Sequence, residues 1–225
     1  MNQETAKTLM KKVVKDYSKI SSEFDRTRQK SWKEFDNYLK FIKEKDKVLD
    51  IGCGNGRFYQ FLKENKKVDY IGMDNNKDLL EHAKSSNPEA KFKEGDLLKI
   101  PAQDNQFDIE VCIAALHHIP TEKLKKKAIK EAHRVLKNKG IYIVSVWNLF
   151  QKKYKKYIWE SRKKSISSFG KYESRDTMIP WGKSGVKRYY YAFKLKELSK
   201  LLEEGGFKIL ENHKGNNFVI ICQKS

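Results

Sequence analysis

The chain has 225 residues, 39% of them hydrophobic and 34% charged, which is enough for one α/β domain with additions or at most two small units. Lys and Arg outnumber Asp and Glu by 48 to 29. The net charge of +19 therefore indicates a polyanionic partner such as RNA, DNA or an anionic membrane surface, or else a Lys-rich composition without such a partner. The three cysteines form no CxxC pair and the five histidines show no zinc spacing, which argues against a disulfide framework and a metal site. No apolar run approaches about 18 residues, which argues against a membrane span, and Met1 to Val14 contain no signal-peptide core. These features predict a cytoplasmic protein.

Residues 4–43 are predicted to form two helices ahead of the main domain. Apolar side chains recur at helical spacing in both. These positions are Leu9, Val13, Tyr17, Trp32, Phe35, Tyr38, Leu39 and Ile42. The segment Ser22 to Trp32 is expected to separate the two helices, and residues 1–45 then form an N-terminal helical cap.

A strand predicted over 47–51 runs into a glycine-rich turn, and a helix over 57–64 follows. Asp50 stands near the end of the strand, and glycines occupy alternate positions after it, at Gly52, Gly54 and Gly56. Glycine allows positive φ and lets a ligand lie against backbone, while the helix N-terminus directs partial positive charge at the turn. A dinucleotide-binding turn requires G-x-G-x-x-G, so this spacing excludes a dehydrogenase. An ordinary strand–turn–helix joint with capping glycines is the alternative.

Two further predicted strands lead to acidic residues. The strand over 68–73 leads to Asp74, 24 positions after Asp50, where a carboxylate is placed to accept both hydroxyls of a ribose. Asn75 and Asn76 follow and offer a cap for the next helix, which is the simpler explanation of these residues. The strand over 90–94 leads to Asp96 and Leu97. Three acids that each end a short strand are hard to explain as separate solvated loop residues.

The D-x-G-x-G-x-G turn and the ordered acids resemble the motifs of class I S-adenosylmethionine (AdoMet) methyltransferases. AdoMet carries a sulfonium and an ammonium but no phosphate, so a carboxylate at the turn attracts it. The resemblance implies S-adenosyl-L-methionine as the cofactor, with the turn holding its methionine part, the second acid its ribose and the third acid its adenine. The expected cofactor-binding residues are Asp50, Gly52, Gly54, Gly56, Asp74, Asn75, Asp96, Leu97 and Ala114.

The segment after a predicted strand over 107–113 carries two adjacent histidines. Ligands of open α/β sheets bind at the carboxyl ends of the strands where the strand order reverses. Ala114 to His118 are therefore expected beside the sulfonium methyl group. His117 is predicted to face the pocket, for substrate contact or proton handling, and His118 to have a structural role.

The rest of the chain continues the alternation of strands and helices, with one interruption. A helix is predicted over 121–137 with a stop at Asn138-Lys-Gly140, then a strand over 140–146. Residues 147–191 are aromatic and basic; the part from 152 to 164 reads as helical and the remainder as a long ordered loop. A helix over 195–204 and a hairpin of strands over 207–211 and 217–223 complete the chain.

The expected architecture is a Rossmann-like class I methyltransferase fold of the α/β class. Its sheet should be seven-stranded and mostly parallel, with an antiparallel last strand. We expect a single domain, with an AdoMet-binding core over 46–147, a substrate-side insertion over 148–193, and a C-terminal helix and strand hairpin over 194–225.

Three short elements outside the AdoMet motifs resemble the tRNA wobble-uridine carboxymethyl methyltransferases. Phe24-Asp-Arg-Thr-Arg28 with Trp32 resembles that family's F-S-x-T-R-x-x-x-W. Asp176-Thr-Met-Ile-Pro-Trp181 resembles D-x-L-V-P-W, and Arg188-Tyr-Tyr-Tyr-Ala-Phe193 resembles R-Y-Y-H-x-F. The resemblance runs from about residue 17 to the C-terminus. It implies methyl esterification of 5-carboxymethyluridine at the wobble position of tRNA.

That reaction requires the substrate carboxylate to be held rather than deprotonated, because its pKa is about 4. Arg28 and Arg188 are the predicted catalytic residues that orient the carboxylate, with His117 beside them. The alternative is that both arginines form salt bridges that hold the insertion against the sheet. Stacking on the splayed base is expected from three aromatic residues, Trp181, Tyr189 and Tyr190.

The resemblance also implies two partners. One is the tRNA anticodon stem-loop, whose phosphates the surface lysines would contact. The other is a small zinc-binding activator protein that adds a strand to the sheet edge, although solvation explains the Lys-flanked third strand equally well. Two rival functions are open: a quinone- or sterol-type methyltransferase, which predicts an uncharged apolar insertion, and a catalytically silent AdoMet-binding subunit that docks RNA.

Overall fold

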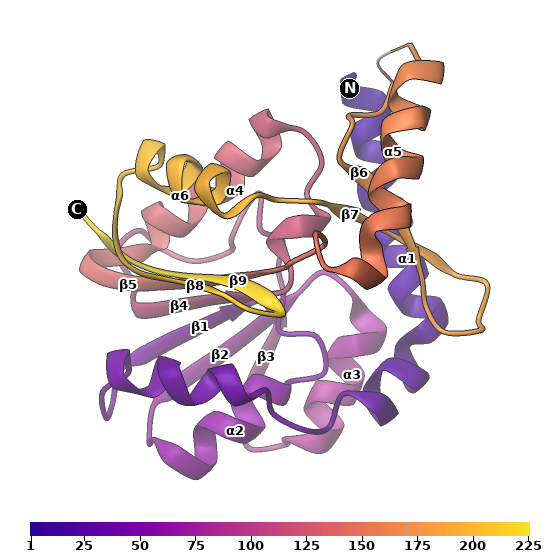
Figure 1. Ribbon diagram of the computed structural model, residues 1–225. Coiled ribbons are helices and arrows are strands. Elements are labelled where there is room, and N and C mark those ends of the chain that lie inside the picture. Colours follow the sequence, from indigo (N-terminus) through magenta and orange to yellow (C-terminus); the bar gives the residue numbers. More distant parts are fainter. Residues whose placement is uncertain (170) are drawn as a thin grey trace.

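A seven-stranded sheet with the strand order β3-β2-β1-β4-β5-β9-β8 forms the centre of the molecule (Figure 1). The computed structural model describes residues 1–169 and 171–225. The strands of the sheet are β1 (Lys47–Ile51), β2 (Asp69–Asp74), β3 (Lys91–Glu94), β4 (Phe107–Ile113), β5 (Leu136–Trp147), β8 (Phe207–Lys214) and β9 (Asn217–Lys224). Strands β1 to β5 pair in parallel, and β9 runs antiparallel to both β5 and β8. The predicted class I methyltransferase sheet is confirmed.

Helices cover both faces of the sheet, and two apolar clusters separate them (Figure 1). The helices are α1 (Gln3–Thr27), α2 (Arg57–Asn65), α3 (Lys77–Ser86), α4 (Glu122–Val135), α5 (Lys155–Ser167) and α6 (Leu195–Glu204), with the 3-10 segments η1 (Lys33–Phe41), η2 (Leu116–His118) and η3 (Lys152–Tyr154). Helices α4 and α6 pack on one face, around Leu49 of β1. Helices α2 and α3 and segment η1 pack on the other face, around Val48. A strand buried on both faces explains the continuous apolar run in β1.

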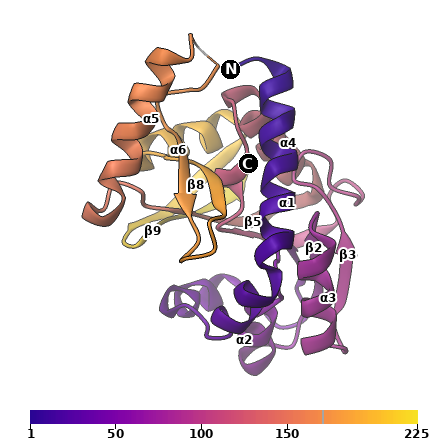
Figure 2. The same ribbon diagram turned by 90° about the vertical axis from the view of Figure 1, so that its right-hand side faces the viewer.

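The N-terminal cap differs from the prediction in its boundaries. Helix α1 continues through Ser22, where a break was expected, and ends only at Thr27. Asn2 caps it by accepting from the backbone N–H of Thr5. The second helical segment, η1, has 3-10 rather than α geometry. Figure 2 shows α1 as one long helix beside α3, so a single element spans the edge of the molecule where the strands β1, β2 and β4 end.

Helix α4 ends earlier than predicted. It stops at Val135, and β5 begins at Leu136 instead of near residue 140. The backbone of Lys139 has a φ of 62°, so the left-handed turn expected near Asn138 exists but lies inside the first part of the strand. The ammonium of Lys224 donates to the Leu136 carbonyl, which ties the start of β5 to the C-terminal strand. No crossover helix lies between β3 and β4 among the described residues.

The segment predicted as a long loop after α5 is a β-hairpin. Strands β6 (Asp176–Pro180) and β7 (Lys187–Tyr191) pair antiparallel and form a separate two-stranded sheet. Asp176 is buried and accepts from the hydroxyl of Tyr189. The Thr177 hydroxyl donates to the Tyr190 carbonyl across the hairpin. These side-chain bonds, which a local sequence pattern does not reveal, join the two strands to each other, and the hairpin packs against α1 and α5 (Figure 1).

Candidate functional site

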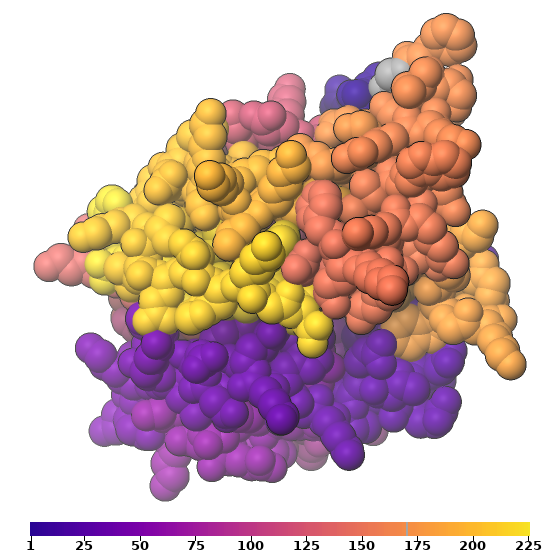
Figure 3. All heavy atoms as spheres, viewed as in Figure 1, coloured from indigo at the N-terminus to yellow at the C-terminus, as the bar shows by residue number. Residues whose placement is uncertain are grey.

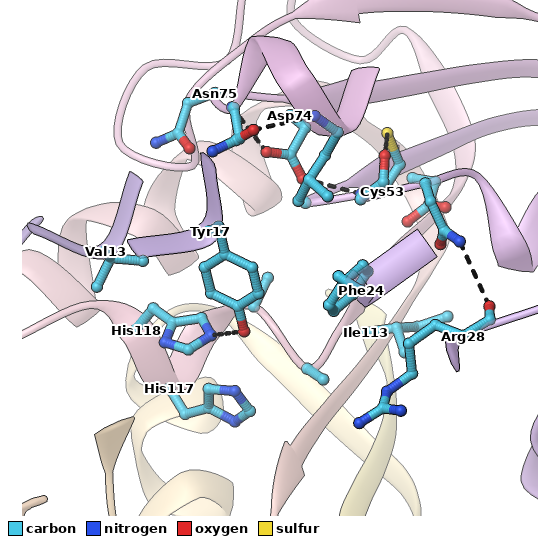
Figure 4. Close-up of a pocket in the computed structure, with 18 of the residues that line it drawn as sticks. Val13, Tyr17, Phe24, Arg28, Cys53, Asp74, Asn75, Ile113, His117 and His118 are labelled. Carbon is cyan, nitrogen blue, oxygen red and sulfur yellow. Dashed lines mark hydrogen bonds between the residues drawn. The ribbon is translucent and has the colours of Figure 1, made fainter. Parts of the chain in front are cut away.

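A pocket lies at the carboxyl ends of β1, β2 and β4, between the glycine turn and helix α1 (Figure 4). Its walls come from α1, the turn after β1, the segments that follow β2, β3 and β4, the end of β5, and β7. The sheet order reverses between β1 and β4, so the pocket occupies the position where open α/β sheets bind ligands. Helix α1 covers it from outside.

The glycine turn has the left-handed backbone that its sequence predicted, with φ of 78° at Gly52, 57° at Gly54 and 77° at Gly56. A Cβ on Gly52 would lie 2.4 Å from the Cβ of Ala115, so no larger residue fits there. Gly52 and Gly54 line the pocket. Gly56 does not; a Cβ on it would meet Asn87 and Phe92 at 3.0 Å. Its expected contact with the cofactor is therefore not supported, and its role is to pack the turn against the core.

Two carboxylates meet the turn, in different ways. Asp50 is 1% exposed; the hydroxyl of Tyr70 donates to its Oδ2, and its Oδ1 has no partner among the described residues. Burial raises the pKa of Asp50 to about 7. Asp74 accepts from the backbone N–H groups of Gly54 at 2.9 Å and Asn76 at 2.8 Å. Burial also raises the pKa of Asp74.

The remaining predicted cofactor residues divide between the pocket wall and its rim. Asn75, Leu97 and Ala114 line the pocket, and Ala114 holds a φ of 54°. Asp96 does not line it. Its Oδ1 accepts from the Leu98 backbone, and its Oδ2 lies 3.4 Å from the donating amide of Asn75. Asp96 therefore lies behind Asn75 and does not line the cavity itself.

The two histidines have distinct environments, which fix their tautomers. The Nδ1 of His118 lies 2.7 Å from the Tyr189 carbonyl, so it must carry the proton, and Nε2 then accepts from the Tyr17 hydroxyl at 2.9 Å. Burial lowers the pKa of His118 to about 3. In His117 the Nδ1 accepts from the Trp147 backbone, which leaves Nε2–H as a buried donor without a partner in the described part of the chain.

His117 is thus a neutral hydrogen-bond donor. It is 1% exposed and lines the pocket. Burial, the neighbouring His118 and the charge of Arg188 hold its pKa well below the usual range. It is therefore suited to contact a ligand oxygen and unsuited to act as a base at neutral pH.

Arg28 and Arg188 line the same pocket, and no carboxylate lies within salt-bridge distance of either among residues 1–169 and 171–225. Arg188 is 3% exposed and its Nε has no partner there. Burial and the charge of Arg188 lower the pKa of Arg28. The alternative that these arginines are salt-bridged to hold the insertion in place is therefore wrong.

Aromatic rings surround the Arg188 guanidinium in place of acids. Its Cζ lies 4.5 Å from the ring centroid of Trp181, 5.1 Å from Tyr190 and 5.4 Å from both Tyr17 and Trp147. The Cζ of Arg28 lies 4.7 Å from the same Trp181 ring. Cation–π contacts stabilise a buried guanidinium without neutralising its charge. The pair therefore remains available to an anion.

The predicted base-stacking residues do not present free ring faces. Tyr189 and Tyr190 are both 0% exposed, so the expectation that they stack on a nucleobase is wrong. Tyr189 points into the main core, and Tyr190 stacks on Trp147 at 4.9 Å. Trp181 is also buried; it contacts both arginines and donates from Nε1 to Glu23 at 2.6 Å. None of these three aromatics lines the pocket; Trp181 and Tyr190 pack against the Arg188 guanidinium.

Sequence reasoning missed the contribution of α1 and of the end of β5. Tyr17 was read as part of an apolar helix stripe, yet it lines the pocket and contacts His118 (Figure 4). It also accepts a hydrogen bond from Arg188. Trp147 lines the pocket beneath Arg188. Asp25 accepts from the amide of Asn55 at 2.9 Å and so joins α1 to the glycine turn. In the sequence, the contact between Asp25 and Asn55 was indicated locally only by the position of Asp25, three residues before Arg28.

Comparisons with known proteins agree with this geometry. A family model described as a methyltransferase domain matches residues 48–140. The tRNA (carboxymethyluridine(34)-5-O)-methyltransferase of Schizosaccharomyces pombe is 30% identical over 221 residues, which cover 93% of this chain and 94% of that protein. A protein of Encephalitozoon cuniculi that is named as a methyltransferase is 32% identical over 198 residues, which cover 87% of each.

Solved structures show the same fold. A SAM-dependent methyltransferase from Methanosarcina mazei has a TM-score of 0.73 and 26% identity, covering 84% of this chain and 96% of that one. A Haloferax volcanii methyltransferase, solved in complex with the Trm112 methyltransferase activator, has a TM-score of 0.66, covering 94% and 97%. Its identity of 13% supports the fold alone.

The pocket fits S-adenosylmethionine as the cofactor. Asp50 offers an unpartnered, buried carboxylate oxygen to a cation, and Gly52 and Gly54 leave the backbone open to a ligand. No cluster of three or more potential metal ligands occurs among the described residues, and no helix described here is long and apolar enough to cross a membrane. The chain therefore belongs to the class I S-adenosylmethionine-dependent methyltransferases, in the family that includes the tRNA carboxymethyluridine methyltransferases.

Proposed function

We propose that this methyltransferase esterifies the carboxylate of a carboxymethyl-modified wobble uridine in tRNA. One observation carries the proposal: Arg28 and Arg188 face the cofactor pocket without an acidic partner among the described residues. Arg188 is buried and Arg28 is half-buried, and guanidiniums removed from water in this way are costly to desolvate and require an anion. A substrate carboxylate supplies that anion at the position where the methyl group is transferred.

The chemistry suits a pocket without a general base. Bound AdoMet supplies an electrophilic methyl group. A carboxylate with a pKa of about 4 is already ionised at neutral pH, so no proton has to be removed. The task of the protein is to hold one carboxylate oxygen in line with the methyl group, which geometry alone can accelerate greatly. Arg28 and Arg188 can form bidentate hydrogen bonds for that purpose.

His117 complements the arginines. Its Nε2–H is a buried donor aimed from the wall that also holds Arg188, and its low pKa keeps it neutral. A neutral donor orients an oxygen without competing for the methyl group as a nucleophile, because its remaining nitrogen lone pair already accepts from Trp147. We assign it to orientation of the substrate carboxylate or its carbonyl oxygen.

The surroundings favour an RNA substrate over a quinone or sterol. A lipid-type substrate requires an apolar lid, whereas residues 148–193 contain many lysines and arginines. The S. pombe relative that covers nearly the whole chain is named for tRNA carboxymethyluridine. The pocket is lined by three arginines, Arg28, Arg57 and Arg188, and by several aromatic rings, which suit a carboxylate attached to a flat base.

An activator subunit of the Trm112 type is a natural partner for the free edge of the sheet. Strand β3 is an edge strand of four residues that pairs only with β2, so one row of its backbone groups is unpaired within the sheet. Edge strands accept a further strand from a partner. The archaeal neighbour of the same fold was solved with such an activator.

The decisive assay is methyl transfer from labelled AdoMet to tRNA carrying 5-carboxymethyluridine, with and without a Trm112-type activator, followed by nucleoside mass spectrometry. An alkali-labile methyl group on the wobble uridine supports the proposal. Label in quinones or sterols contradicts it. Tight AdoMet binding with no transfer to any tRNA identifies the catalytically silent RNA-docking alternative.

A further inference from the structure

Helix α5 and the residues next to it form the most concentrated positive surface of the chain. Between residues 152 and 171 there are eight Lys or Arg residues and a single acid, Glu160. All eight cations are exposed, and none pairs with a carboxylate among the described residues. They are Lys152, Lys153, Lys155, Lys156, Arg162, Lys163, Lys164 and Lys171. The positive charge of the chain is therefore concentrated on this segment and not distributed evenly.

Large apolar side chains stand exposed among these cations. Trp159 is 58% exposed, Ile166 is 82% exposed and Phe169 is 100% exposed. Trp159 and Ile166 are seven residues apart, with Lys163 between them on the same face of the helix. The Lys163 ammonium lies 3.4 Å from the centroid of the Trp159 ring. Exposed aromatic rings interleaved with lysines are typical of surfaces that bind single-stranded nucleic acid.

The opposite face of α5 packs behind the pocket wall, through side chains that do not line the pocket themselves. Ile158 is buried in a small cluster with Tyr190, and Tyr154, just before the helix, stacks on Trp147 at 6.1 Å. Trp147 and Arg188 line the pocket itself. In Figure 3 the α5 segment, in orange, forms a prominent ridge on the surface. A nucleotide that enters the pocket must leave its neighbours in the chain on the surface around it.

We propose that the outer face of α5, defined by Trp159, Lys163, Lys164 and Ile166, together with Phe169 just beyond the end of the helix, binds the RNA strand that adjoins the methylated nucleotide. The inference rests on the proposed function, since it assigns to that RNA a place on the protein. Lysines contact the phosphates, and the Trp159 ring stacks on an unpaired base of the loop. An anionic membrane is the less favoured occupant, because the apolar residues are separated by cations and form no continuous apolar face.

The test compares two α5 variants with one matched control. Trp159→Ala removes the stacking ring, and the double variant Lys163→Glu/Lys164→Glu reverses the charge of two phosphate contacts. Lys127→Glu/Lys130→Glu makes the same charge change on α4, where both lysines are exposed and lack an acidic partner within the described ranges. Binding of a labelled anticodon stem-loop RNA is measured by fluorescence anisotropy over a series of salt concentrations, with S-adenosylhomocysteine present so that no transfer occurs.

The two α5 variants should lose RNA affinity with different dependences on salt concentration. Trp159→Ala should raise Kd at least about fivefold without changing the salt dependence, because stacking is not ionic. The double variant should raise Kd about tenfold or more and lower the slope of log Kd against log salt by about 1 to 2. The α4 control should stay within about twofold of wild type. Calorimetry with S-adenosylhomocysteine verifies that each variant is folded.

Three outcomes overturn the inference. The first is wild-type RNA affinity in both α5 variants, and the second is an equal loss in the α4 control, which would reveal a general charge effect. The third is that phosphatidylserine vesicles retain wild-type protein and not the α5 variants while RNA affinity is unchanged. RNA binding that depends on α5, without ester formation on any tRNA, would support this RNA-binding surface and reject the proposed reaction. Ester formation on tRNA, with wild-type RNA affinity in the α5 variants, would support the proposed reaction and reject the surface.

Discussion

The hydroxyl of Tyr17 accepts a hydrogen bond from the guanidinium of Arg188 at 3.1 Å, although the two residues are 171 positions apart in the chain. The same hydroxyl donates to Nε2 of His118, whose Nδ1–H is held by the Tyr189 carbonyl. A continuous chain of hydrogen bonds thus runs from the backbone of β7 through His118 and Tyr17 to Arg188. Because each donor and acceptor is fixed, the chain sets the direction of the guanidinium.

Tyr17→Phe removes this positioning bond and leaves the ring in place. A hydrogen bond to a charged group contributes about 1.5 to 3 kcal/mol, so kcat/KM for tRNA should fall roughly 10- to 100-fold. S-adenosylhomocysteine affinity should change little, because Asp50, Asp74 and the glycine turn are untouched. Tyr157→Phe on α5 is the matched control, since no hydrogen bond of its hydroxyl occurs in the described part of the structure. Equal kinetics in both variants would show that Arg188 needs no such support.

The geometry of the arginine pair can be tested separately from its charge. Arg28→Lys and Arg188→Lys keep the positive charge but lose the planar fork that binds a carboxylate at two points. Each should lower kcat/KM by about 100-fold or more if the fork aligns the reacting oxygen. Calorimetry with S-adenosylhomocysteine should give near-normal affinity. Lysine variants as active as wild type would mean that only a point charge is needed and that the clamp is not bidentate.

The sheet and the glycine turn were predictable because their signals are local. Alternating strands and helices, and glycines two positions apart, follow from backbone sterics within a few residues. The β6–β7 hairpin was missed for the opposite reason. In Arg188-Tyr-Tyr-Tyr191 every residue is buried, so no alternation of apolar and polar positions marks a strand. Tyr189 and Tyr190 point into different apolar clusters on its two sides, which only the assembled fold provides.

In the candidate site, too, residues with a local sequence signal were predicted, and residues that only the assembled fold brings into place were not. Asp50 and Asp74 lie at the ends of predicted strands and were found from the sequence. The proximity of Arg28 and Arg188 was expected only through the resemblance to a family, because 160 positions separate them. Tyr17 was hidden, since a tyrosine on an amphipathic helix is usually a core residue. Its hydroxyl gains a role only once β7 folds against α1.

Asp50 should make cofactor binding depend on pH. Its pKa is raised to about 7, so it is largely protonated at pH 6 and ionised at pH 8. A cationic ligand favours the ionised form; AdoMet affinity should therefore weaken as pH falls below 7, by up to about tenfold per pH unit. Isothermal titration calorimetry from pH 6 to 8 measures this change. Asp50→Asn should bind more weakly at pH 8 and show only the titration of the ligand itself, and identical pH profiles in the two proteins would rule Asp50 out.

Glu110 should make the fold less stable as pH rises. It lies in β4 with 1% exposure, and neither carboxyl oxygen has a partner among the described residues. Burial, with the charge of Glu131, raises its pKa well above the usual range, so the folded protein keeps a proton that the unfolded chain releases above about pH 4. Unfolding is therefore favoured progressively as pH rises toward the folded pKa.

Glu110→Gln removes this titration while conserving shape. The unfolding free energy of the variant minus that of wild type should increase from pH 5 to pH 8, by up to about 1.4 kcal/mol per pH unit. Urea denaturation at each pH, followed by circular dichroism, gives the difference. Glu64→Gln, at an exposed position of α2, controls for the loss of one carboxylate. A constant difference between Glu110→Gln and wild type across this range would mean that Glu110 is ionised in the folded state, and that a partner or trapped water satisfies it.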